Sequence, residues 1–176
     1  MVTVNFDPEG NLRKWNSINT KVLESIDKRS YKDAGTYAIK AYEFAVSVDN
    51  PQWIANSLNN LGQIMCATNN YEDAEHTYKR ALQIILDYYG KDCLDAAMVV
   101  SNLATLHYEK GNYRLAEAGY LEAIRIKKMN LPPDHHSLEK TILNLAQMYK
   151  KTGYTDRAER LLETELHSNN RQSWRP

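Results

Sequence analysis

The chain contains little of what several specialised protein classes require. It has only two cysteines, Cys66 and Cys93, among 176 residues, and two are too few for a disulfide framework. Its 22 basic and 22 acidic residues cancel, so no net charge favours a nucleic acid or an anionic membrane as a partner. Uncharged apolar runs such as residues 96–101 are much shorter than the roughly 20 residues of a membrane helix. We therefore expect neither nucleic acid nor membrane among the partners of this protein.

Signals for secretion and for chain breaks are equally scarce. Residues 1–7 lack the basic segment followed by an apolar one that marks a secretory signal. Together with the low cysteine content, this favours a cytoplasmic location. The chain has only 7 glycines and 5 prolines, whereas alanine, leucine, glutamate, lysine and glutamine recur throughout, and these residues favour helix.

Short strings of residues recur along the chain with one fixed step. An Asn-Leu-Gly/Ala string stands at residues 60–62, 102–104 and 144–146, so both steps are 42 residues. An Ala-Glu pair follows with the same step, at residues 74–75, 116–117 and 158–159. Several matches at one period indicate a repeat protein, in which each unit is one supersecondary element.

The second half of each unit has the spacing of an amphipathic helix. Tyr71, Ala74, Tyr78, Ala81 and Ile85 follow one another at steps of three and four residues. That spacing places them on one face of a helix, whereas it would scatter them over both faces of a strand. The sequence therefore predicts a helix here, and the same holds for the corresponding residues of the other units.

Small and turn-forming residues divide each unit into two helices. Small residues stand where two helix backbones would approach closely, at Gly62, Ala104 and Ala146. Turn residues follow each first helix, at Asn69, Gly111 and Gly153. Capping side chains precede a proline at Asp7-Pro8 and Asn50-Pro51, which predicts that helices begin there.

The order of small residue, turn, aromatic, alanine, aromatic and alanine resembles the tetratricopeptide repeat family. The residues that carry the resemblance in the second unit are Gly62, Asn69, Tyr71, Ala74, Tyr78 and Ala81. The 42-residue step and the Gly90-Lys91-Asp92 string are similar to the kinesin-light-chain subtype of that family. The resemblance implies an all-α fold, a right-handed α-solenoid of about four antiparallel helix pairs.

We expect one repeat array over residues 8–167, between two tails. The units are predicted at about residues 8–49, 50–91, 92–133 and 134–167, with an N-terminal tail at 1–7 and a flexible C-terminal tail at 168–176. The first unit is degenerate because its first helix lacks the Asn-Leu-Gly/Ala string, as terminal units of such arrays often deviate.

The concave wall of a stacked array is built from the first helix of each unit, and its residues are the candidates for binding a peptide. Carboxamides are frequent on this wall, and each can pair with both the N–H and the C=O of an extended peptide. In the resembling family, asparagines at this place hold peptide backbone; alternatively, they bond neighbouring helices and fix their stacking. The candidates are Asn60, Gln63, Asn102, Thr105, Tyr108, Lys140, Asn144, Gln147 and Lys150.

Residue patterns of known chemistry are missing from the sequence. The five histidines share no metal-ligand spacing with the cysteines or with a carboxylate, and no glycine-rich phosphate loop occurs. We expect no catalytic residue, no metal and no cofactor. The interpretation is a non-catalytic adaptor or scaffold that binds a protein or peptide in its groove. The alternative is a weakly self-associating scaffold or subunit, in which apolar residues of the final helix, among them Leu161, Leu162 and Leu166, are exposed.

Overall fold

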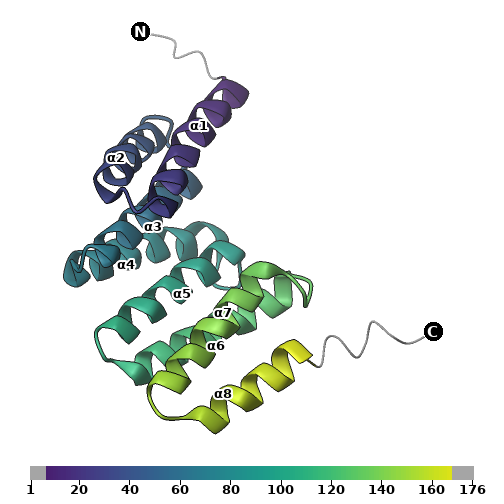
Figure 1. The fold of residues 1–176 in the computed structure, drawn as a ribbon. Coiled ribbons are helices and arrows are strands. Elements are labelled where there is room, and N and C mark those ends of the chain that lie inside the picture. Colours follow the sequence, from purple (N-terminus) through teal and green to yellow (C-terminus); the bar gives the residue numbers. More distant parts are fainter. Residues whose placement is uncertain (1–6, 168–176) are drawn as a thin grey trace. The chain divides into compact units, whose positions relative to one another are not determined.

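The structure, a computed structural model, describes residues 7–167 of the chain, and all its regular elements are helices (Figure 1). Eight α-helices are followed by one π-helical turn, so the predicted all-α class is confirmed. The chain divides into two compact units at Tyr88 and Tyr89. The two predicted tails, apart from Asp7, lie outside the described residues.

The first unit contains four helices, and the two predicted caps lie at the beginnings of the first and the third. Asp7 accepts a hydrogen bond from the Gly10 N–H at 2.9 Å, and Asn50 accepts one from the Trp53 N–H at 3.0 Å. Asn69 takes the positive φ of 61° in the turn before the fourth helix. The helices are α1 (Pro8–Asp27), α2 (Tyr31–Ser47), α3 (Pro51–Ala67) and α4 (Tyr71–Tyr89).

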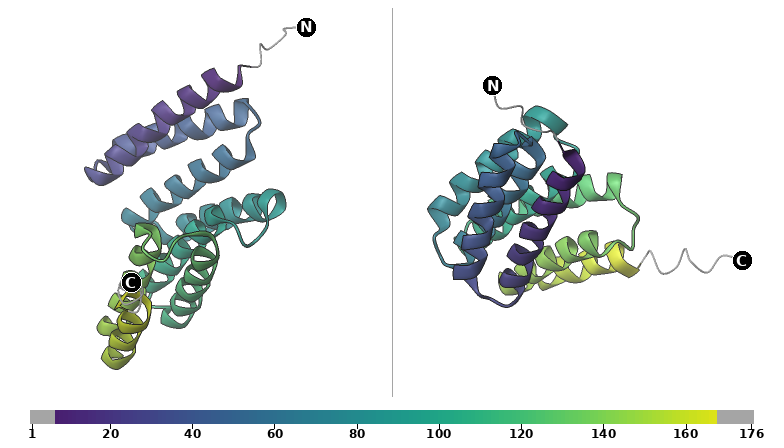
Figure 2. Two further views of the ribbon diagram at one scale, coloured as in Figure 1. Left: turned by 90° about the vertical axis from the view of Figure 1, so that its right-hand side faces the viewer. Right: turned by 90° about the horizontal axis from the view of Figure 1, so that it is seen from above.

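Small residues allow the helices of the first unit to pack closely. Helices α1, α2 and α3 lie side by side (Figure 2). The buried face of α2 is a stripe of four alanines at positions 34, 38, 41 and 45, each fully buried. Gly62 of α3 lies against Tyr78 of α4, where an added Cβ would be 2.7 Å from the ring. The predicted close approach at Gly62 is therefore confirmed.

Aromatic rings connect α1, α2 and α3 of this unit. Trp15 of α1 stacks on Trp53 of α3, with ring centroids 5.3 Å apart and planes 10° from parallel. Phe44 of α2 stacks on Trp53 in turn at 6.5 Å. Such pairs add about 0.5–1.5 kcal/mol to the burial of apolar area. Aromatic contacts therefore hold α1 in place, although its sequence lacks the Asn-Leu-Gly/Ala string.

The second unit repeats the arrangement of helical hairpins. Its core joins alanines to large residues, including Tyr120, Leu145 and Tyr149. Gly119 takes the role of the small residue between helices, because an added Cβ would be 2.9 Å from the Ala104 Cβ. The elements are α5 (Leu94–Glu109), α6 (Tyr113–Asn130), α7 (His136–Lys151), α8 (Thr155–Leu162) and the π-helical η1 (Glu163–His167).

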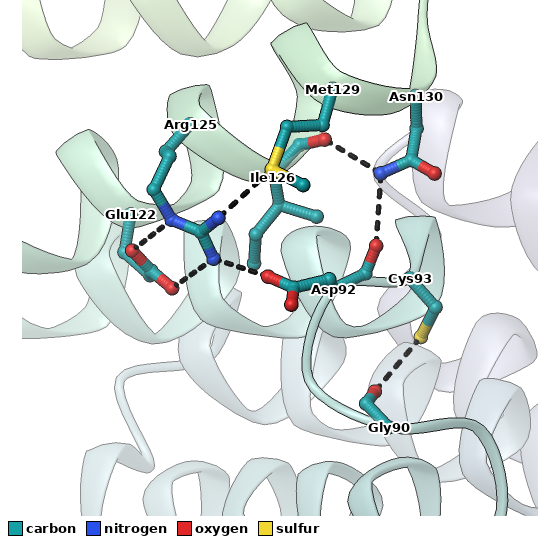
Figure 3. Close-up of polar contacts among 8 residues, drawn as sticks. All are labelled: Gly90, Asp92, Cys93, Glu122, Arg125, Ile126, Met129 and Asn130. Carbon is teal, nitrogen blue, oxygen red and sulfur yellow. Dashed lines mark hydrogen bonds and ion pairs between the residues drawn. The ribbon is translucent and has the colours of Figure 1, made fainter.

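Polar contacts attach the loop before α5 to helix α6. Figure 3 shows Arg125 donating to both carboxylate oxygens of Glu122, at 2.9 and 2.8 Å, and to Asp92 of the loop. Asn130 donates to the backbone oxygens of Asp92 and Ile126, at 2.9 and 2.8 Å. The Arg125 hydrogen bond holds the pKa of the Asp92 carboxyl below its usual value. These contacts fix the chain where it enters α5, the helix that carries much of the candidate site.

Candidate functional site

A pocket opens between α5 and α7 in the second unit. Its volume is ≈ 120 Å³, and α6 contributes one residue to its floor. The lining residues are Thr105, Tyr108, Glu109, Tyr120, Asn144, Gln147 and Lys151. Because α5 and α7 are the first helices of successive hairpins, the pocket lies on the wall where the sequence places the binding candidates.

Hydrogen bonds order the floor of the pocket. Thr105 Oγ1 lies 3.1 Å from the Ser101 carbonyl oxygen, to which it donates, and 2.9 Å from the Tyr120 hydroxyl. The Tyr120 ring is buried, with 2% exposed. A core aromatic residue therefore also supplies a polar group to the pocket.

One wall of the pocket combines an aromatic ring with a cation. Lys151 Nζ lies 5.8 Å from the ring centroid of Tyr108, which is within the range of a cation–π contact. Tyr108 also packs against Tyr113, with ring centroids 6.0 Å apart. The ring is thereby held in place between the core and the pocket.

Four of the nine predicted residues come together in this pocket, and they are Thr105, Tyr108, Asn144 and Gln147. Asn102 lies on the same helix as Thr105 and is half-buried, but it does not line the pocket. Lys140 and Lys150 lie on α7 with exposed side chains, and they also stand outside the lining.

The two candidates of the first unit have a different environment. Asn60 is buried, and its Nδ2 donates to Oδ1 of Asn19 on α1 at 2.8 Å. This bond between helices is what the structural alternative for the asparagine series predicts. Gln63 of α3 is half-buried. The asparagines at corresponding positions of the repeats therefore do not share one environment.

Three residues of the pocket lining, Glu109, Tyr120 and Lys151, are absent from the predicted set. Glu109 follows Thr105 by four residues and so lies on the same face of α5, a spacing that the sequence could have revealed. The Tyr120 hydroxyl is harder to foresee, because the repeat pattern marks this tyrosine as a core residue. Lys151 follows the predicted Lys150 and replaces it in the lining.

Charges of both signs meet at the pocket. Glu109 is the last residue of α5, and Lys151 is the last residue of α7. Helix C-termini carry partial negative charge, so the lysine is well placed and the glutamate adds to the negative end of its helix. The pocket therefore offers one cationic and one anionic edge, together with two carboxamides.

Titratable groups with shifted pKa values lie in the second unit outside the pocket. Burial, with Lys140 nearby, lowers the pKa of Lys127 to about 8, and its Nζ donates to the Ser137 carbonyl at 3.0 Å and to Thr141 Oγ1 at 2.7 Å. Burial and a hydrogen bond to Glu117 raise the pKa of Tyr149 to about 12. Both groups connect helices to one another.

Within residues 7–167, no group of three or more histidine, cysteine, aspartate or glutamate side chains is arranged to hold a metal ion. His135 instead caps α7, where its Nδ1 accepts from the Ser137 N–H at 3.1 Å. Over the same residues, no helix has the length and apolar character needed to cross a membrane.

Comparison with protein families identifies the repeat. A model described as tetratricopeptide repeat matches residues 26–87 and residues 53–129, and a second model of that description matches residues 141–172. Among curated proteins, the RxLR effector protein SFI4 of Phytophthora infestans is 22% identical over 116 residues. This match covers 66% of the present chain and 34% of the effector, so the chain spans about a third of that relative.

Solved structures share the fold at low sequence identity. BtubC (BKLC) from P. vanneervenii has a TM-score of 0.72 and 20% identity, over 88% of this chain and 63% of its own. A protein described as a kinesin light chain of Podospora anserina, with nearly identical TPR-like repeats, has a TM-score of 0.74 and 14% identity, over 90% and 76%. These likenesses confirm the predicted α-solenoid class.

Proposed function

The chain belongs to the tetratricopeptide repeat family, and on that premise we propose that it is a non-catalytic adaptor that binds an extended peptide of a protein partner across α5 and α7. Proteins of this family generally mediate protein–protein interaction or scaffolding. The observation that carries the proposal is the pocket in which Thr105, Tyr108, Asn144 and Gln147 meet. We propose Asn102, Lys140 and Lys150 as flanking contacts on the same two helices.

The side chains of the pocket have the chemistry that an extended backbone needs. An extended peptide presents N–H and C=O groups on both edges, and each loses hydrogen bonds to water when it is covered. Asn144 and Gln147 can each donate and accept, so they can replace those bonds whatever the peptide sequence. Tyr108 offers apolar area beside them, as aromatic residues do at many interfaces.

A selection from random peptides displayed on phage, with the whole chain as bait, tests this proposal. Peptides that the chain enriches should bind Asn144→Ala about 5- to 150-fold more weakly, since losing one matched polar group costs about 1–3 kcal/mol. Asn16→Ala is the matched control, because Asn16 is exposed on α1. Equal loss of binding in both variants, or no enriched peptide, would refute the proposal.

Two other interpretations have less support. An enzyme is less favoured because this repeat fold is typically non-catalytic. Self-association depends on exposed apolar residues of the last helix, but Leu161, Leu162 and Leu166 are half-buried and pack against the core of their own unit. Light scattering at several concentrations measures self-association directly, and a concentration-dependent mass would support it.

A further inference from the structure

The pocket between α5 and α7 is balanced in charge, and this restricts what kind of side chain it accepts. Glu109 and Lys151 both line it. An acidic guest would gain from Lys151 but meet Glu109 and the negative ends of two helices. A basic guest would gain from Glu109 but meet Lys151. Neither charge is matched, so a guest with a formal charge would lose hydration without full compensation.

The floor of the pocket presents oxygen instead of a donor hydrogen. Thr105 has one hydroxyl hydrogen, and Oγ1 lies 3.1 Å from the Ser101 carbonyl oxygen and 2.9 Å from the Tyr120 hydroxyl. Either oxygen can be the donor in the contact with Tyr120, and in both cases the Thr105 hydrogen is used within the protein and an Oγ1 lone pair remains. A guest therefore meets an acceptor at Thr105 and at Glu109, and a donor at Lys151. A group that carries both a donor and an acceptor fits this arrangement.

The size of the pocket is also informative. Its volume of ≈ 120 Å³ is several times the roughly 10–15 Å³ that one water molecule needs on the same measure, so a small polar side chain can enter.

We propose that this pocket takes the primary carboxamide of an asparagine or glutamine side chain from the bound peptide. The guest's carbonyl oxygen accepts from Lys151, and its amino group donates to Glu109 and to Thr105 Oγ1. Asn144 and Gln147 remain for the guest's backbone. This inference rests on the proposed function, because it names the side chain that accompanies the backbone contacts.

The test uses one extended, uncharged host peptide of serine and threonine with a single variable central residue. The whole chain is titrated with hosts that carry Asn, Gln, Asp, Lys or Ala, and binding is followed by NMR of the backbone amides of Thr105, Tyr108 and Asn144. The Asn or Gln host should bind at least about threefold more tightly than the other three. If the Ala host binds equally well, the inference fails while the proposed function stands; if no host binds, both fail.

Two charge variants make the test specific to the pocket. Glu109→Gln should make the Asp host the preferred ligand, and Lys151→Gln should do the same for the Lys host. Glu139→Gln on α7 and Lys32→Gln on α2 are matched controls, because both residues are exposed outside the lining, and their preferences should equal those of the wild type. A wild-type preference for Asp or Lys, or no change in preference in the two pocket variants, would overturn the inference.

Discussion

The two compact units share one helical frame but differ in the contacts that fix their helices. In α1–α4, a stack of Trp15, Trp53 and Phe44 and a carboxamide pair of Asn19 and Asn60 join α3 to α1 and α2. In α5–η1, ionic contacts connect them, including those of Glu117 with Arg157, Lys128 with Glu165 and Arg125 with Asp92. The frame of small and aromatic residues therefore sets the fold, and the contacts around it are free to vary.

This difference extends to the surface where a guest would bind. The first unit uses its asparagine at position 60 to connect α3 to α1, whereas the second unit brings Asn144 to the pocket. The same position of the repeat thus connects two helices at Asn60 and lines a pocket at Asn144.

The largest expected effect is the loss of the aromatic stack in the first unit. Trp15 is buried, so Trp15→Ala should lower the free energy of unfolding by about 3–5 kcal/mol. The sequence has tryptophan only at 15, 53 and 174. In a Trp174→Phe background, the fluorescence of Trp53 therefore reports on α1–α4 during urea unfolding. Leu12→Ala is the control, since Leu12 is 46% exposed. A similar loss of unfolding free energy in Leu12→Ala would contradict the stabilising role of the aromatic stack.

The second prediction concerns the buried cation of the second unit. Lys127 is 6% exposed, and its neighbours Ser137 and Thr141 are neutral. Replacing a buried ion pair by apolar residues of similar volume is often neutral or stabilises a protein by about 1–4 kcal/mol, and a cation bonded to neutral groups has less Coulombic compensation for its lost hydration. Lys127→Met should therefore raise the free energy of unfolding at pH 7, measured by circular dichroism in urea.

The pH dependence of this effect has a definite sign. The pKa of Lys127 is lowered from 10.5 to about 8 by burial, with Lys140 as a smaller cause. The folded chain thus binds fewer protons than the unfolded chain between these values, so the wild type gains stability as pH rises through this range. The advantage of Lys127→Met should be largest below pH 8 and decline toward pH 10.5. The exposed Lys150→Met should show no such decline.

The hairpins could be predicted from the sequence because they depend on local spacing, and the connections between helices could not. Alanine and tyrosine positions such as Ala74 and Tyr78 fix which face of a helix is buried, and the structure agrees. The burial of Lys127 and the pairing of Asn60 depend on residues far along the chain, and periodicity carries no information about them. The same holds for α8, which ends at Leu162 and continues as a π-helical turn. Within the site, the repeat register predicts Thr105 and Gln147. The place of Tyr120 in the pocket floor depends on how the helices pack, which the sequence pattern does not give.

The third prediction tests what the two units have in common. Gly62→Ala places a Cβ 2.7 Å from the Tyr78 ring, and Gly119→Ala places one 2.9 Å from Ala104. Overfilling a packed interface typically costs about 1–3 kcal/mol. Both variants should lose stability by this amount in urea unfolding, whereas Gly35→Ala has open space around its Cβ and should be neutral or more stable. If only one of the two substitutions destabilises the protein, close packing around a small residue is not common to the two units.

The smallest effect separates neutral contacts from ionic ones by their response to salt. Arg157 is half exposed and bonds Glu117. Arg157→Met should therefore lower the free energy of unfolding by only about 0.5–1 kcal/mol. The loss should be smaller at about 1 M salt, where charges are screened within about 3 Å. Asn60→Ala breaks a bond between uncharged groups, and its cost of about 1 kcal/mol should be the same at low and high salt. Urea unfolding of both variants at the two salt concentrations provides the comparison. Equal salt dependence would mean that the ionic contacts of the second unit contribute through packing rather than charge, since Arg157 also covers the ring of Tyr149 at 4.5 Å.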